Sequence, residues 1–196
     1  MRLFVAVEIP PEILDRLRLL IEDLREEVPG VRWARPEGIH LTLKFLGEVT
    51  EQEVGPLRLE LAKAVPGSTS PFPVDVAGTG VFPEKGRPRV VWAGLRQDGE
   101  ALPGERADSL VELRAAVEGA VRAAGLTRVK EETRPFKPHL TLARLGEGRP
   151  PAALAEAIAS RREMPVGRFV VSSVWLFQSH LKPGGAVYRK MEEYRL

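Results

Sequence analysis

The sequence predicts an α+β fold: two lobes of mostly antiparallel sheet, related by a pseudo-twofold axis, with flanking helices and a cleft between them. Strand-like segments are grouped, with a few helices between them. In addition, residues 35–48 and 134–147 form a repeat that is identical at 9 of 14 positions without a gap. The offset of 99 residues, about half of the 196-residue chain, indicates two copies of one supersecondary unit packed together.

The first half of the chain has clear signals for where elements begin and end. Pro10 and Pro11 open a helix with an apolar stripe, and Pro29-Gly30 end it. Thr50 and Glu53 form a capping box for a second helix. The expected elements are a strand at 2–8, a helix at 11–28, a histidine-containing strand at 40–46, a helix ending near 65, and strands at 72–82 and 89–95.

The second half repeats this order after a polar segment, 97–108, which we expect to be a connector. Ser109 and Glu112 form another capping box, and Gly125 ends the helix that follows. The remaining expected elements are a histidine-containing strand at 139–144, a helix at 152–161, and strands at 166–177 and 186–191. A chain of 196 residues is long enough for one sizeable domain or two small lobes, and with the repeat we expect residues 1–196 to form one domain made of two repeated lobes.

Composition and charge exclude several kinds of site. The chain has no cysteine, which excludes disulfides, thiolate catalysis and cysteine-based metal sites. The net charge of +2 permits a phosphate or nucleic-acid ligand without requiring one. No apolar run reaches membrane-spanning length, so we expect a cytoplasmic protein without membrane contact, and a monomer.

Each copy of the repeat contains the tetrapeptide His-Leu-Thr-Leu, at 40–43 and at 139–142. In a strand, side chains alternate between the two faces, so His and Thr share one face and both leucines point to the core. One such tetrapeptide is a weak signal, because a single His is commonly a core residue that caps a strand. Two copies, which use two of only three histidines, favour a shared site.

Two imidazoles in one cleft suit general acid–base chemistry near neutral pH. The hydroxyls of Thr42 and Thr141 can donate hydrogen bonds to the non-bridging oxygens of a phosphoryl group. Lys44, expected on the face of His40 and Thr42, and Arg144, at the end of the second strand, can neutralise charge that develops on those oxygens. A metal site is not expected, because two histidines without clustered carboxylates make an incomplete ligand shell.

These motifs resemble those of the 2H phosphoesterase superfamily, and most closely those of the bacterial and archaeal RNA 2′,3′-cyclic phosphodiesterases, once called 2′-5′ RNA ligases. Both His-x-Thr-x motifs match in full. The flanking segments that also match are 2–7, 44–47, 82–92 and 135–138, and near the end Ser179, Pro183-Gly184-Gly185 and Tyr188. The resemblance extends over the whole chain and no motif residue is missing.

The resemblance implies metal-independent opening of a 2′,3′-cyclic phosphate at an RNA 3′ end, without a cofactor, to leave a 2′-phosphate. It also implies that His40 is the proton donor and His139 the proton acceptor, which the nearly symmetric motifs alone leave open. The expected ligands are RNA with cyclic phosphate ends, such as tRNA fragments, or cyclic nucleotides. Two alternatives are a 2′-5′ RNA ligase that joins such ends to 5′-hydroxyls, and a non-catalytic RNA-end binder that uses the same cleft.

Overall fold

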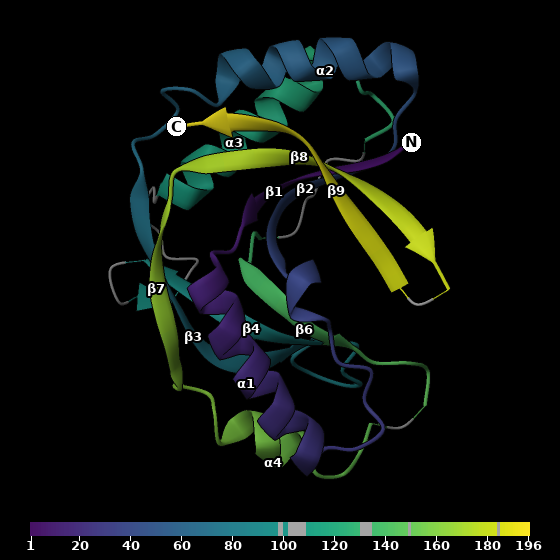
Figure 1. The fold of residues 1–196 in the computed structure, drawn as a ribbon, viewed down its shortest axis with the longest axis vertical. Coiled ribbons are helices and arrows are strands. Elements are labelled where there is room, and N and C mark those ends of the chain that lie inside the picture. The colour runs from purple at the N-terminus through teal and green to yellow at the C-terminus, as the bar shows by residue number, and fades with distance from the viewer. Residues whose placement is uncertain (98–99, 102–108, 130–134, 149, 184) are drawn as a thin grey trace.

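The computed structural model describes residues 1–97, 100–101, 109–129, 135–148, 150–183 and 185–196. Strands and helices follow one another along the chain in nearly the predicted order (Figure 1). The elements are β1 (Arg2–Glu8), α1 (Pro11–Glu27), the 3-10 helix η1 (Pro36–Gly38), β2 (His40–Glu48), α2 (Glu51–Ala64), β3 (Phe72–Phe82), β4 (Val90–Gln97), β5 (Glu100–Ala101), α3 (Ser109–Ala123), β6 (His139–Arg144), α4 (Leu154–Ala159), β7 (Pro165–Val171), β8 (Ser173–Lys182) and β9 (Gly185–Arg195).

All strands join one sheet in the order β7-β3-β4-β6-β2-β1-β8-β9, and β5 pairs with β4. Each pairing among the described residues is antiparallel. This confirms the predicted α+β class with a mostly antiparallel sheet. The two histidine strands, β2 and β6, lie next to each other in the middle. Outward from them, β4 occupies the place that β1 has on the other side, β3 that of β8, and β7 that of β9.

The two lobes are not the two halves of the chain. One, here called the terminal lobe, contains β1, β2, β8 and β9, and therefore both ends of the sequence. The other, the middle lobe, contains β3, β4, β6 and β7. The single strand predicted at 166–177 is wrong: it is β7 and β8, one in each lobe, separated by the exposed Ser172. The buried positions shift by one across Ser172, from Phe169 and Val171 to Val174 and Leu176, and the prediction overlooked this change.

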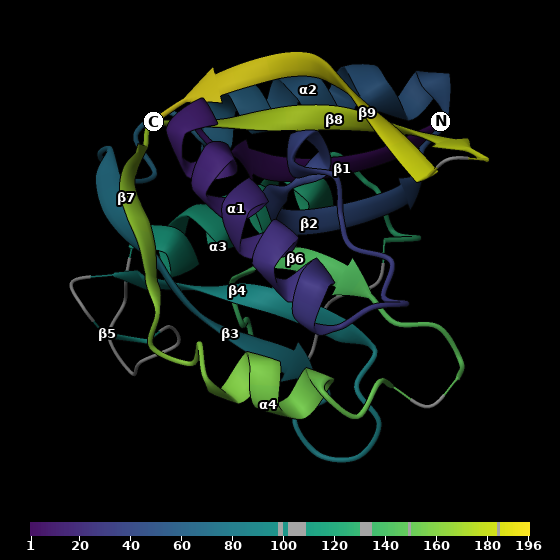
Figure 2. The same ribbon diagram turned by 60° about the horizontal axis from the view of Figure 1, so that its bottom comes forward.

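The helices bind the lobes to each other. Helix α1 follows β1 of the terminal lobe but packs against β7 and α4. Helix α3 follows the middle lobe's β4 but packs against α2 and β2. Figure 1 shows α2 and α3 near one end of the molecule and α4, beside the end of α1, at the other, and Figure 2 shows α1 crossing from one lobe to the other. One continuous core contains buried residues from all four helices and from the inward faces of the strands.

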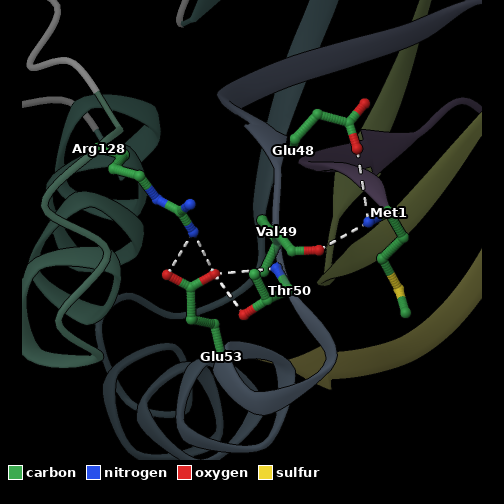
Figure 3. A network of polar contacts seen from close by, with 6 residues as sticks. All are labelled: Met1, Glu48, Val49, Thr50, Glu53 and Arg128. Atoms are coloured by element: carbon green, nitrogen blue, oxygen red, sulfur yellow. Dashed lines mark hydrogen bonds and ion pairs between the residues drawn. The ribbon is translucent and has the colours of Figure 1, made fainter.

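Polar contacts fix the start of α2 (Figure 3). The backbone N–H and the hydroxyl of Thr50 donate to the carboxylate of Glu53 at 2.9 and 2.8 Å, which is the predicted capping box. Arg128, which follows α3, donates to both oxygens of the same carboxylate at 2.7 and 2.6 Å. Nearby, the amino group of Met1 donates to the carbonyl of Val49 at 2.6 Å. Glu53 thus joins α2 to the end of α3.

Several predicted boundaries differ by a few residues. Helix α4 covers six residues rather than the ten expected at 152–161, and β9 is longer than the predicted strand at 186–191. The predicted connector at 97–108 begins within β4, which extends to Gln97, and it contains the short strand β5. Residues 98–99 and 102–108 of that segment lie outside the described residues.

The segment that follows α4 packs against β3 at a bulge formed by Gly78. The N–H of Gly78 donates to the carbonyl of Met164 at 2.8 Å, and the hydroxyl of Thr79 donates to the carbonyl of Ile158 at 2.9 Å. Gly78 has φ +72°, in the left-handed region that favours glycine. A Cβ at this position would lie 2.2 Å from the carbonyl oxygen of Arg162. The close approach of two backbones therefore depends on glycine here.

We predict that Gly78→Ala destabilises the protein by about 2–4 kcal/mol. Alanine is strained in the left-handed backbone conformation, and its Cβ would also push away the backbone carbonyl of Arg162. The control is Gly119→Ala, in the middle of α3, where a Cβ meets no atom within 4 Å. That change should stabilise by about 0.5–1 kcal/mol. Urea unfolding of both variants measures the two effects, and a Gly78→Ala variant as stable as the wild type would contradict the argument.

Candidate active site

The two histidine strands meet at one pair of leucines. Leu41 lies opposite Leu140 in the antiparallel pairing of β2 with β6, and both side chains are buried in the core. This register places His40 opposite Thr141 and, one step along, His139 opposite Thr42. All four side chains are half-buried on the other face of the sheet, here called the open face. The histidines are thus diagonal neighbours, with backbones about 7–8 Å apart.

Both imidazole rings are held in the same way. Nδ1 of His40 lies 2.9 Å from the carbonyl oxygen of Gly38, and Nδ1 of His139 lies 2.7 Å from that of Lys137. In each case the carbonyl belongs to the residue two positions earlier. Since a carbonyl oxygen only accepts, Nδ1 carries the hydrogen and donates it. Nε2 of each ring is left as the nitrogen that can take or give a proton.

Both strands contain a bulge at the second leucine of the motif. Across from β1, Ala6 pairs with Thr42 but Val5 pairs with Lys44, so Leu43 is the extra residue. Across from β4, Trp92 pairs with Thr141 but Val91 pairs with Ala143, so Leu142 is the extra residue. Beyond each bulge the alternation of faces is reversed.

The reversal decides which side chains reach the open face. Lys44 and Ala143 turn into the protein and are buried, at 7% and 1% exposure. Phe45 and Arg144, which occupy equivalent positions in the repeat, are exposed instead. Arg144 therefore emerges on the face of both histidines; its role as a phosphate ligand stays a prediction.

The prediction that Lys44 lies on the face of His40 and Thr42 is wrong. Its ammonium group is 3.6 Å from the carboxylate of Glu118 on α3, which packs against β2 on the core side. Arg114 also donates to Glu118, at 2.7 Å. The prediction extended strict alternation through Leu43, where the bulge interrupts it. Lys44 is therefore part of the contact between α3 and the sheet.

The surroundings of the two rings are unequal. The ring centroid of His40 lies 4.6 Å from that of Phe4, 4.9 Å from that of Tyr188 and 6.1 Å from that of Phe177. Burial among these rings lowers the pKa of His40 to about 4, while its bond to the Gly38 carbonyl opposes the shift. The charge of Arg144 lowers this pKa further.

His139 has fewer aromatic contacts. Its ring meets the Phe82 ring edge-on at 5.0 Å. Burial lowers the pKa of His139, and Arg144 contributes in the same direction. Arg144 thus acts on both imidazoles, which places one cation beside two potential proton carriers.

Thr42 and Thr141 share the open face with the histidines, and the register sets each of them opposite the histidine of the other strand. Within the described part of the chain, no hydrogen bond joins either hydroxyl to another residue. The same residues include no group of three or more His, Asp or Glu side chains arranged to hold a metal ion. Sequence reasoning gave no role to Phe82 or Tyr188, which are ring contacts of the histidines. Their only signal was that both lie in segments that match the family.

The sequence model of one protein family, the LigT-like phosphoesterases, matches residues 7–92 and 101–188. These two ranges include both His-x-Thr-x motifs. The chain belongs to this family. A relative from Thermus thermophilus named RNA 2′,3′-cyclic phosphodiesterase is 36% identical over 198 residues, covering 100% of this chain and 90% of the relative. One of the same name from Archaeoglobus fulgidus is 32% identical over 194 residues, covering 99% of both chains.

Two solved structures share the fold. A Thermus thermophilus protein, TT0787, superposes with a TM-score of 0.77 at 32% identity and covers 100% of this chain and 98% of its own. The Escherichia coli LigT complexed with 3′-AMP has a TM-score of 0.71 at 25% identity, with coverage of 100% and 97%. As a separate finding, no helix in the described residues of this LigT-like chain is long and apolar enough to cross a membrane.

The placement of Lys44 in the core predicts that Lys44 on β2 and Arg144 on β6 differ in how much they contribute to catalysis. Lys44→Met should keep kcat/KM for a nucleoside 2′,3′-cyclic phosphate within about threefold, because the side chain lies in the core. Arg144→Met should lower it by about 10²–10³, the usual cost of removing a charged group that stabilises a transition state. Initial rates for both variants measure the contrast, and equal losses would contradict the assignment of Lys44 to the core.

Proposed function

We propose that this protein hydrolyses RNA 2′,3′-cyclic phosphate ends to 2′-phosphomonoesters, with His40 as proton donor and His139 as proton acceptor. The observation that carries the proposal is the pair of imidazoles on one face. Each is fixed through Nδ1 to a backbone carbonyl, and both are close enough to Arg144 for its charge to affect them. Such a pair can supply an acid and a base to one phosphorus atom.

The comparisons support this reaction in two ways. Curated relatives that align along nearly the whole chain carry the name RNA 2′,3′-cyclic phosphodiesterase. The Escherichia coli LigT, which shares the fold, has been solved with 3′-AMP, a ribonucleotide with a phosphate on the ribose. We therefore assign RNA with cyclic phosphate ends, or the corresponding cyclic nucleotides, as the substrate class. A cytoplasmic location and a monomeric state stay predictions from the sequence.

The reaction needs one proton to be taken and one to be given. Nε2 of His139 accepts a proton from water as the water oxygen attacks phosphorus. The bond from phosphorus to the ribose O3′ breaks in line, and Nε2–H of His40 donates its proton to O3′. The products are a 2′-phosphate and a free 3′-hydroxyl. Both histidines end in the opposite protonation state, so proton exchange with solvent completes the cycle.

The remaining open-face groups suit the phosphoryl oxygens. Thr42 and Thr141 share the open face with the two rings and can donate hydrogen bonds to the two non-bridging oxygens. The Arg144 guanidinium can then balance the negative charge that builds up in the transition state. A hydroxyl from each strand and one cation would hold phosphorus between Nε2 of His40 and Nε2 of His139.

His40→Ala and His139→Ala should each lower kcat by about 10²–10⁴, the contribution of one general acid or base. Melting temperatures should change little, because neither ring belongs to the main core. The third histidine, His180, is exposed on β8, and His180→Ala is the matched control.

This test uses a 2′,3′-cyclic-phosphate oligonucleotide in the presence of EDTA, with the product isomer identified. Hydrolysis by the wild type should survive EDTA, since imidazoles perform both proton transfers. Near-wild-type turnover by either active-site variant would refute the acid–base pair. The product distinguishes the alternatives as well: a 2′-5′ linkage with an added 5′-hydroxyl strand indicates ligation, and binding without turnover indicates an RNA-end binder.

The lowered pKa values predict an acidic optimum for kcat/KM. The rate falls above the pKa of the acid, which must be protonated, and below the pKa of the base, which must be neutral. The pKa of His40 is about 4, and that of His139 is lowered from the ordinary value of about 6.5. The bell-shaped pH profile of kcat/KM should therefore have its maximum below pH 6.5.

The profile of kcat, which reports the substrate complex, should lie at higher pH than that of kcat/KM. A bound phosphate anion stabilises imidazolium and so raises the pKa of both rings. Rates at saturating and at low substrate between pH 4 and 9 give both profiles. A kcat/KM maximum above pH 7.5 would contradict the burial of the two rings.

A further inference from the structure

The two carbonyls that receive the Nδ1 hydrogens are fixed in different ways. The carbonyl before His40 belongs to Gly38, the last residue of the 3-10 helix η1. The N–H groups of Gly38 and of the residue after it donate to carbonyls around the start of that turn, both at 2.9 Å. Backbone hydrogen bonds of the turn therefore hold the Gly38 carbonyl in place.

The carbonyl before His139 has no such turn. It belongs to Lys137, in the segment Pro-Phe-Lys-Pro at 135–138, whose two prolines have no N–H to donate. Within the described part of the chain, no turn or loop hydrogen bond of the backbone involves these four residues. The proline that follows Lys137 confines it to extended conformations, so its carbonyl moves with the residues before it. Side-chain contacts must then fix the direction of this carbonyl.

Two side-chain contacts hold the segment. The ammonium of Lys137 donates to the carboxylate of Glu84 at 2.7 Å, but the two side chains are 49% and 63% exposed, so solvent screens this pair. The guanidinium of Arg114, on α3, lies over the ring of Phe136, 4.5 Å from its centroid. The Arg114 side chain is only 12% exposed, and a contact between a cation and an aromatic ring is stronger when it is shielded from water. The contact with Arg114 is therefore the stronger of the two.

The guanidinium of Arg114 is itself fixed by charged neighbours. Its Nε and Nη2 both donate to the carboxylate of Glu118, one turn later on α3, at 3.0 and 2.7 Å. The buried ammonium of Lys44 on β2 lies 3.6 Å from the same carboxylate. Lys44, Glu118 and Arg114 thus form a row of alternating charges from β2 to the segment before β6.

We propose that Arg114 is a positioning residue for His139: through the ring of Phe136 it keeps the Lys137 carbonyl directed at Nδ1. A neutral imidazole carries one hydrogen, and the partner of one ring nitrogen decides which of the two nitrogens carries it. Without a fixed acceptor at Nδ1, the hydrogen can move to Nε2, which then cannot accept a proton. The catalytic consequence rests on the proposed function, in which Nε2 of His139 is the base, whereas the effect on the ring does not.

Nitrogen-15 NMR of the histidine rings tests the positioning directly, because long-range proton–nitrogen spectra show which ring nitrogen carries the hydrogen. At about pH 8, above the ordinary pKa of histidine, His139 of the wild type should carry it on Nδ1. Arg114→Met removes the cation and keeps an unbranched side chain. It should give a mixture of both forms at His139 and leave His40, the internal control, unchanged. Arg114→Lys restores a cation and should return His139 toward the wild-type form.

Turnover of adenosine 2′,3′-cyclic phosphate measures the consequence for the base. Arg114→Met should lower kcat about tenfold, within the about 10²-fold that a small misplacement of a reacting group can cost. KM should change less than about threefold, because no contact with the substrate is removed. Phe136→Leu should lower kcat by the same factor as Arg114→Met. The double variant should also be about tenfold slower, rather than about a hundredfold, because both changes remove the same contact.

The matched control is Arg128→Met, which removes another arginine–glutamate pair of this region, the one with Glu53. It reports the effect of lost stability alone, and it should keep both the His139 spectrum and kcat. An unchanged His139 spectrum in both Arg114→Met and Phe136→Leu would overturn the proposal. So would an equal change in Arg128→Met, or losses in kcat that multiply in the double variant.

The spectra and the rates together separate this inference from the proposed reaction. A mixture of forms at His139 in Arg114→Met, together with no turnover by the wild type, would keep the positioning role and remove the hydrolase. Normal turnover by the wild type, together with an unchanged His139 in Arg114→Met, would do the reverse.

Discussion

The site depends on the pairing of β2 with β6 through Leu41 and Leu140. Both leucines are fully buried, as are their neighbours Leu142 and, almost completely, Leu43. A slip of one residue in either strand would move its leucines to the open face and its histidine into the core, which is a large loss of buried apolar surface. The hydrophobic contacts between β2 and β6, which hold the two lobes together, therefore also place both imidazoles on the open face.

The bulges show what a repeat in the sequence does and does not reveal. Strict alternation predicts the faces of His40 and Thr42 correctly but fails at the next step, because Leu43 is inserted relative to β1. A bulge depends on the partner strand, which lies some forty residues away in the chain, so residue alternation within β2 gives no sign of it. The equivalent position in β6 holds Ala143, which is apolar, and this was the one available hint that the Lys44 position faces the core.

The fold was predictable wherever local signals set the boundaries of an element. Strands β3 and β6 match the predicted ranges, and the Thr50 capping box marks the start of α2. The lobes were not predictable in the same way. That β8 returns to pair with β1 is decided by contacts between residues more than 160 positions apart, and β9 joins the sheet through β8. Neither periodicity nor turn residues carry information on such distant partners.

The near-symmetric backbone supports two chemically different histidines. The ring of His40 is enclosed by Phe4, Phe177 and Tyr188, whereas His139 meets one aromatic ring among the described residues, that of Phe82. The pKa of His40 is consequently about 4, so its imidazole is neutral at pH 7 before a ligand arrives. Holding it neutral avoids a second positive charge beside Arg144 on a half-buried face.

The arrival of an anion changes this balance. A phosphate placed between the two rings offsets the charge of Arg144 and stabilises the imidazolium form of His40. Proton uptake by the donor is then thermodynamically linked to binding of the group that will receive the proton. Binding of the substrate therefore causes His40 to be protonated. Without substrate, the aromatic side chains around His40 keep its ring neutral. The two copies of one motif thus acquire separate roles from their side-chain surroundings rather than from their backbone geometry.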